Sequence, residues 1–304
     1  MKFTVQPWSP EYGAPSGRED IDAAAVDIDV EVKAASWSPI PVRCDPAPEV
    51  MFVDGVRRID ANLWIDEDDG TPTLALAASY AAGAVICNHS AKVVGTEVRR
   101  GVFATGRAAN DIETKHARYQ VHMAPVSTAE ELSWELQMKM GDLEALIVAN
   151  QGGQAGLIVA DGPLSHRPKL LEAVGYVKTH QTHYLPPGLR SILSQLTAGD
   201  RTPLFLTGGS WSRYSWYLKL PLTGGGPMDG IIRAEITSDR DLAAARQMAD
   251  LTAATLCRFA SSAHKDPRAP QNLYPIGGLE KRLHHLLGDR DLMYRSLRVA
   301  ASRN

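Results

Sequence analysis

Two short apolar runs in this chain each end on the dipeptide Asp-Gly, and this pattern constrains the fold more than any other feature. The first run ends at Asp54 and the second at Asp161, while a third, residues 174–178, ends on Lys178. Apolar runs of this length beside glycine are typical of strands buried on both faces of a sheet. Charged residues at the ends of such strands lie at the sheet edge, where open α/β sheets hold their sites. The sequence therefore predicts two carboxylates and an ammonium group together at one edge of a sheet.

The composition is that of a globular protein and argues against several classes. Hydrophobic residues make up 44% of the chain and charged residues 22%. Cys44, Cys87 and Cys257 lie far apart without a CxxC pair, which argues against a disulfide frame or a zinc ribbon. No apolar segment approaches the roughly 20 residues of a membrane helix, and residues 1–13 lack a signal-peptide pattern. We therefore expect a cytoplasmic protein with no membrane partner.

The charge is distributed unevenly along the chain. Residues 1–50 contain nine acidic and four basic side chains, whereas the whole chain has a net charge of −3. The alternation of polar and apolar residues at 27–32 predicts a half-buried strand. We expect two parts, an acidic N-terminal arm with a strand at 1–47 and a single main domain at 48–304.

The remaining pattern predicts an α/β fold with a mixed central sheet, flanking helices and extra β-hairpins. A strand that ends at Asp54 is expected to be followed by a hairpin partner at 56–65. A capping box at Ser127–Glu130 predicts the start of a long helix. The other predicted elements are strands within 73–106 and near 204–206, 216–220 and 230–236, and helices near 168–173, at 238–260 and after Pro275.

Asp54 and Asp161 are the first candidates for chemistry. Carboxylate oxygens are the ligands that Mg²⁺ and Mn²⁺ prefer, and two such ions can cleave a phosphodiester by activating water and stabilising the leaving oxygen. The glycine after each aspartate permits a sharp turn and a close approach of substrate. The alternative is structural, because Asp-Gly is also a common turn signal.

Two further positions, Glu144 and Lys178, extend this candidate metal site. Glu144 lies on the predicted long helix, on the same side as its apolar stripe, and a carboxylate there must be paired or bound to something. Glu130, Glu131 and Glu135 are its rivals. Lys178 is expected to offer a positive charge to a phosphate, or else to extend from a strand end into solvent.

Basic residues suggest contacts with a nucleic-acid backbone. Arg57 and Arg58 directly follow the first Asp-Gly, and a C-terminal segment gathers four more basic or imidazole side chains. Such clusters can bind phosphates, although they also occur as solvated surface or at the end of a helix. The four C-terminal residues are Lys281, Arg282, His284 and His285.

Taken in order, these pieces resemble the NurA nuclease family. The segment 52–58 resembles the first apolar-Asp-Gly-Ser motif of the family, with Val56 in place of the serine. The segment 157–164 resembles its second motif, with Pro163 in place of the serine. The segment 175–179 resembles the lysine strand of the family, and Tyr274 with the following proline resembles its late Tyr-Pro. Arg282 stands where members often have a histidine, so His284 or His285 is expected to substitute.

The resemblance implies a ribonuclease-H-like core and a manganese- or magnesium-dependent DNA nuclease. It implies that Asp54, Glu144 and Asp161 are metal ligands, that Lys178 stabilises the phosphate, and that Tyr274 is auxiliary. It further implies a homodimer, and a HerA-like hexameric ATPase as partner in processing DNA ends.

Two other function classes remain open from the sequence. One is a non-catalytic subunit that binds DNA or assembles with an ATPase, and it differs from the nuclease in whether the three carboxylates converge. The other is an actin-like phosphotransferase, whose related core also begins with an Asp-Gly strand but adds further phosphate-binding loops.

Overall fold

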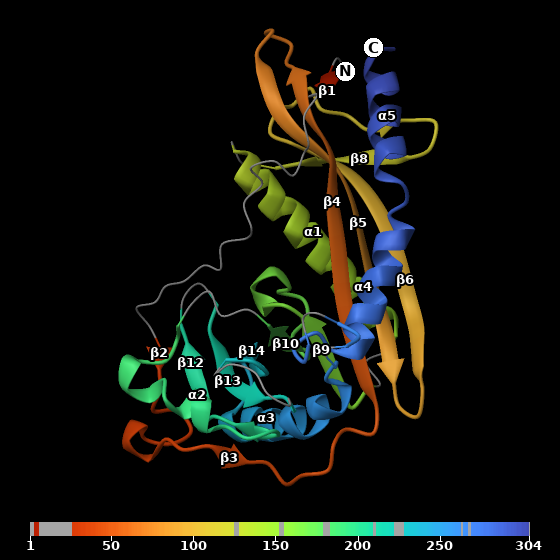
Figure 1. The fold of residues 1–304 in the computed structure, drawn as a ribbon. Helices are drawn as coiled ribbons and strands as arrows, with labels where there is room; N and C mark the ends of the chain where they lie inside the picture. The colour runs from red at the N-terminus through yellow and green to blue at the C-terminus, as the bar shows by residue number, and fades with distance from the viewer. Residues whose placement is uncertain are drawn as a thin grey trace.

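The computed structural model describes residues 3–5, 26–124, 128–151, 155–178, 183–208, 211–221, 228–262, 264–266 and 269–303. One mixed sheet runs through the molecule, and helices pack against both of its faces (Figure 1). The strands are β1 (Phe3–Val5), β2 (Val26–Asp27), β3 (Ile40–Pro41), β4 (Val50–Asp66), β5 (Pro72–Cys87), β6 (Ala91–Ala104), β7 (Ile112–Glu113), β8 (Arg118–Met123), β9 (Leu157–Asp161), β10 (Val174–Val177), β11 (Asp200–Arg201), β12 (Phe205–Thr207), β13 (Arg213–Lys219) and β14 (Ile231–Thr237). The α-helices are α1 (Ala129–Asn150), α2 (Ile192–Gln195), α3 (Leu242–Leu256), α4 (Tyr274–Leu286) and α5 (Arg290–Ala301), and the 3-10 turns are η1 (Ala34–Ser36), η2 (Leu164–His166), η3 (Pro187–Leu189) and η4 (Cys257–Phe259).

The strand order places the ends of β4, β9 and β10 near one another. Along the main path of the sheet the order is β2-β12-β13-β14-β10-β9-β4-β5-β6-β8-β7. The strands β4, β5 and β6 form an antiparallel meander, while β9 lies parallel to β4 and β10 lies parallel to β9. The helix α1 lies between β8 and β9 in the chain and so forms part of the crossover that leads from the meander to the parallel strand β9. This confirms the predicted mixed α/β sheet flanked by helices.

A β-bulge divides the long strand β4 into two halves. Asp60 has no partner on β5, because the residues on either side of it pair with Ala78 and Ala77. Side chains alternate between faces along a strand, so the extra residue reverses which positions face a given side. Before the bulge Phe52 packs in one apolar cluster with α4, and beyond it Leu63 packs in another with α5. Figure 1 shows α4 and α5 following one another along the long strands.

The first Asp-Gly does not end a strand, so the expected hairpin partner at 56–65 is wrong. The strand β4 continues to Asp66, and its partner is β5. Gly55 lies inside β4, where a Cβ would come within 2.6 Å of Glu144 Oε1 and 2.8 Å of Met140 Cγ. The glycine therefore makes room for α1 and does not form a turn.

The helices cover opposite faces of the sheet. The helix α1 packs with one apolar cluster that includes Met51 of β4, and α3 and α4 pack with another that includes Phe52. The cap of α1 is Thr128, whose side chain pairs reciprocally with Glu131, so the predicted box is displaced by one position and Ser127 lies outside the described residues. Among the described helices, none combines the length and apolar character needed to cross a membrane.

The later elements are partly as predicted. The expected strands near 205, 216 and 231 are confirmed as β12, β13 and β14, and α3 begins after the capping residue Asp241. The helix expected near 168–173 is wrong, because the segment contains turns after η2. Pro163 and Pro168 flank η2, and a proline disfavours helical backbone in the residue before it.

The described part of the N-terminal arm is joined to the sheet. Only β2 forms from the strand expected at 27–32, and it pairs with β12, while β3 pairs with β11. Glu31 lies between them with its carboxylate buried, and it accepts hydrogen bonds from Arg201 and from the backbone N–H of Leu204. These contacts attach residues 26–41 to the part of the chain assigned to the main domain.

Candidate active site

Asp54 and Asp161 lie beside each other on parallel strands. Val53 pairs with Ala160, so the two aspartates occupy the next position of β4 and β9, where neighbouring strands are about 4.8 Å apart. Asp161 is the last residue of β9, while Asp54 is the fifth residue of a strand that continues beyond the edge. Because residues in register point to the same face, both carboxylates lie on the α4 side of the sheet.

The Asp54 carboxylate is strongly buried, and its surroundings oppose ionisation. The residue is 5% exposed, and one carboxylate oxygen accepts a hydrogen bond from the N–H of Gly55 at 2.8 Å. Burial raises its pKa well above the usual value, and the negative charges of Asp161 and Glu144 raise it further. A carboxylate held this way is stabilised by any cation that binds beside it.

Lys178 meets Asp161 at the edge of the sheet, as the sequence predicts. The Lys178 ammonium donates to Asp161 Oδ2 at 2.7 Å. The other oxygen of Asp161, Oδ1, is buried and has no hydrogen-bond partner among the described residues. A buried carboxylate oxygen without a donor is free to bind a cation.

Glu144 reaches the same place from the opposite face of the sheet. It lies on α1, is fully buried, and has a carboxylate oxygen close to the backbone of Gly55. Both of its oxygens accept hydrogen bonds from Arg167, including a 2.9 Å bond to Nη2. Burial raises the pKa of Glu144 in spite of the guanidinium beside it, so its ionised form depends on Arg167.

Arg167 was not predicted to belong to the site. It is 4% exposed, and besides its pair with Glu144 it donates to the backbone carbonyls of Asp161 at 2.7 Å and Pro163 at 2.8 Å. Burial lowers its pKa, but the charge and hydrogen bonds of Glu144 outweigh this and raise it. The only hint in the sequence that Arg167 could belong to the site was its place six residues after Asp161.

Asn272 is a second residue that the sequence analysis left without a role. Its Oδ1 accepts a hydrogen bond from Lys178 at 3.3 Å, and its Nδ2 donates to Asp266 Oδ2 at 2.5 Å. A Cβ at Gly277 would lie 2.9 Å from that Nδ2, so the glycine makes room for the amide. Asn272 therefore connects Lys178 to the beginning of α4.

The predicted auxiliary residues are spread along α4 and do not gather. Tyr274 is the first residue of the helix, near Asn272, and its hydroxyl lies 2.6 Å from Ser262 Oγ. His284 and His285 are exposed at the other end, about 15 Å away along the axis. The structure therefore places Tyr274 at the border of the site and separates the two histidines from it.

The four predicted DNA-binding residues do not form one surface. Arg57 and Arg58 are successive residues of β4 and point to opposite faces. Arg58 donates to Asp60 and to the Gly288 carbonyl at 2.7 Å, just beyond the end of α4. Burial lowers the pKa of Arg57. Lys281 and Arg282 remain exposed on α4.

The donor set fits a divalent cation at two of the three predicted ligands. Asp54 and Asp161 provide adjacent hard oxygen ligands, and Asp161 Oδ1 lacks a partner among the described residues. Mg²⁺ and Mn²⁺ commonly bind through one or two carboxylates, with water and phosphate completing the shell. Glu144 does not join them, since Arg167 occupies its oxygens, and no group of three carboxylate, imidazole or thiolate side chains suited to a metal is found in the described part of the chain.

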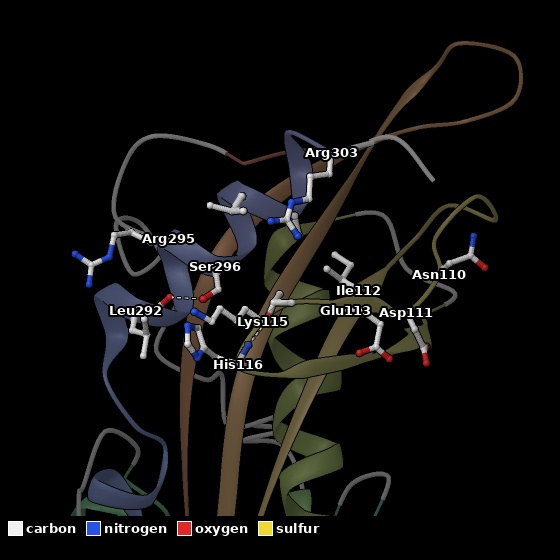
Figure 2. Close-up of a pocket in the computed structure, with 13 residues that line it drawn as sticks. Asn110, Asp111, Ile112, Glu113, Lys115, His116, Leu292, Arg295, Ser296 and Arg303 are labelled. Atoms are coloured by element: carbon white, nitrogen blue, oxygen red, sulfur yellow. Dashed lines mark hydrogen bonds between the residues drawn. The ribbon is translucent and has the colours of Figure 1, made fainter.

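A pocket of about 550 Å³ lies elsewhere, between α5 and the segment around β7. Figure 2 shows Lys115 and His116 facing Ser296 of α5, with Arg303 above them. The lining mixes acidic and basic side chains and contains none of the predicted site residues. The candidate chemistry therefore remains with the carboxylates on β4 and β9.

Comparisons with known proteins agree with the resemblance seen in the sequence. The family described as the NurA domain matches residues 79–276. Among solved structures, the chain is similar to the crystal structure of the NurA nuclease from Sulfolobus solfataricus, with 11% sequence identity, a TM-score of 0.52, and coverage of 88% of this chain and 86% of that chain. At this identity the likeness concerns the fold. The comparison with curated proteins finds no match.

The matched range contains most of the site. It includes Glu144, Asp161, Lys178 and Tyr274, and it begins after Asp54. It also covers more than half of the 304 residues. The chain therefore belongs to the NurA domain family.

Proposed function

We propose that this protein is a divalent-metal-dependent DNA nuclease that acts on DNA ends or single strands. The observation that carries the proposal is the pair of adjacent carboxylates, Asp54 and Asp161, with Lys178 on the second of them. The structural relative from Sulfolobus solfataricus is a nuclease by its description, and this supports the proposal.

The cofactor of the proposed reaction is Mn²⁺ or Mg²⁺, held by Asp54 and Asp161. When bound, such an ion supplies Lewis-acid activation of water and stabilisation of negative charge on a phosphate. Lys178 places an ammonium group beside the same carboxylate, where it can bind a non-bridging phosphate oxygen. Asn272 orients that ammonium group. Its amide nitrogen donates to Asp266, which holds the amide so that its oxygen faces Lys178 and accepts the hydrogen bond from it.

The fold type and the partners also belong to the proposal. The strand order β6-β5-β4-β9-β10, with β9 and β10 parallel to β4, supports a core of the ribonuclease-H-like type. Family membership supports a homodimer, a HerA-like hexameric ATPase as partner, and a role in DNA end processing.

A second candidate is a non-catalytic subunit that binds DNA or assembles with an ATPase. One observation favours it, since Arg167 pairs with Glu144 and Lys178 with Asp161, so two of the three predicted metal ligands already have cationic partners. The nuclease is preferred because Asp161 Oδ1 is buried without a partner in the described residues, which a purely structural ion pair does not require.

The test is degradation of end-labelled single- and double-stranded DNA with Mn²⁺, Mg²⁺ or EDTA. The wild type should cleave with a divalent metal and not with EDTA, and Asp161→Asn should reduce cleavage by at least about 100-fold, as expected when an electrostatic contribution to the transition state is lost. The matched control is Asp142→Asn, because Asp142 lies on α1 and pairs its half-buried carboxylate with the exposed Lys169, away from the site. The control should cleave like the wild type.

Two results would contradict the proposal. If a folded wild type cleaves neither single- nor double-stranded DNA with Mn²⁺ or Mg²⁺, alone or with its ATPase, the result would favour the non-catalytic subunit. Equal cleavage by Asp161→Asn and the control would show that the activity does not come from this site.

A further inference from the structure

Arg167 is a fixed part of the site. All of its nitrogens donate: Nε and Nη2 to Glu144, Nη1 to the Pro163 carbonyl, and Nη2 also to the Asp161 carbonyl. The residue and its carboxylate partner are both buried. These four hydrogen bonds, two of them a bidentate pair with a carboxylate, fix both the position and the plane of the guanidinium.

The segment that carries Arg167 is itself anchored. Gly162 has a φ of 103°, which turns the chain after β9, and its N–H donates to the Tyr176 carbonyl at 2.8 Å. Two residues later the N–H of Leu164 donates to the buried carboxylate of Glu235 at 2.7 Å. The guanidinium is therefore held by the backbone that follows Asp161.

The charges of the site limit how many divalent ions it can hold. When all three carboxylates (Asp54, Glu144 and Asp161) are ionised, they and the two cations (Arg167 and Lys178) leave a net charge of −1. One divalent ion brings this to +1, which the single negative charge of a phosphodiester balances. A second divalent ion would leave +3 before the substrate binds, in a site where Asp54 and Glu144 are almost completely buried.

The supply of free carboxylate oxygens also limits the site to one divalent ion. A second ion beside Asp54 would need Glu144, but both oxygens of Glu144 are bound by Arg167. No free space for an ion remains beside the Gly55 backbone, because Glu144 Oε1 already lies against it. Only Asp161 Oδ1 is both buried and without a partner among the described side chains around Asp54.

We propose that the Arg167 guanidinium takes the place of a second divalent cation, so that the site accepts a single Mn²⁺ or Mg²⁺ at Asp54 and Asp161. Arg167 is then a positioning residue that holds Glu144 and supplies one fixed positive charge. This inference rests on the proposed nuclease function, and it replaces the two-ion arrangement expected from the sequence.

The first test counts Mn²⁺ bound to the purified full-length protein, from the free Mn²⁺ signal in electron paramagnetic resonance, without DNA. The wild type should bind one ion per chain, and Asp161→Asn should lose it. Two ions per chain in the wild type, both lost or weakened by Glu144→Gln, would overturn the inference and leave the nuclease proposal standing. No bound ion together with no cleavage would overturn both.

A second test uses the guanidinium directly. Arg167→Met should raise the count from one ion to two, because it frees Glu144 and removes a positive charge, and Arg167→Met/Glu144→Gln should return it to one. A folded Arg167→Met that still binds one ion would overturn the inference. If Arg167→Met does not fold, the double variant still decides, since the two-ion arrangement predicts that it binds fewer ions than the wild type.

Discussion

The Arg167–Glu144 pair gives a prediction for stability that is independent of activity. Arg167→Met removes the partner of a buried carboxylate, and stranding one member of such a pair costs about 3–5 kcal/mol of unfolding free energy. It also leaves the carbonyls of Asp161 and Pro163 without this donor. Arg167→Met/Glu144→Gln strands no charge, so only the lost carbonyl contacts remain, at about 1–3 kcal/mol. The double variant should therefore be more stable than Arg167→Met.

The assay is urea unfolding followed by circular dichroism, with EDTA present so that metal binding does not contribute. The pH dependence provides a second check. Removing Arg167 should raise the pKa of Glu144 further, so the defect should be present in full at pH 8 and diminish as the pH falls and the carboxyl group binds a proton. A loss below about 1 kcal/mol in Arg167→Met, or additive effects in the double variant, would refute the reasoning.

Two further predictions concern β4. Asp54→Asn should stabilise the metal-free protein at pH 8 and have little effect near pH 4. The reason is the raised pKa of Asp54, which makes the folded state lose stability as the pH rises above the ordinary carboxyl range. Thermal unfolding at both pH values measures this, and a difference between variant and wild type that is the same at both would contradict it. Gly55→Ala should cost about 1–3 kcal/mol in urea unfolding, because the new methyl group would lie 2.6 Å from Glu144 Oε1; a variant as stable as the wild type would show that α1 yields easily.

The part of the site that the sequence predicted comes from strand ends. Asp161 ends one short buried strand and Lys178 directly follows another, and parallel neighbours bring such residues to one edge. Asp54 was placed correctly beside Asp161 although its strand continues past it. The prediction succeeded because a buried apolar run is a local signal, and the pairing of parallel strands then leaves few arrangements.

The partners of these residues could not be predicted in the same way. Arg167 directly follows the short 3-10 segment η2, and its pairing with Glu144 depends on how α1 crosses behind β4, which no local pattern encodes. The same holds for Asn272, which reaches Lys178 from a segment 94 residues away. The part played by Glu31 in attaching the N-terminal segment is likewise a long-range contact with Arg201.

The Asp-Gly pattern predicted a break in β4 at residues 54–55, because Asp-Gly is a common turn signal. The strand instead continues through this dipeptide to Asp66. Its irregularity lies further along, at Asp60, an extra residue in the ladder with β5. The buried carboxylate of Asp60, which accepts hydrogen bonds from Ser79 and Tyr119, stabilises the bulge that joins the two halves.

Because of the bulge at Asp60, the number of residues in β4 decides which face of the sheet each side chain of its second half points to. The register with β9 fixes the half that contains Asp54, and the register with β5 fixes the half that packs under α5. Deleting one residue between them would turn Leu63 and its alternate neighbours away from the α5 core without moving Asp54. Deleting or inserting two residues would leave every side chain of β4 on the face it now occupies. Length changes among relatives in this stretch should therefore come in even numbers, or as single residues matched by a compensating bulge.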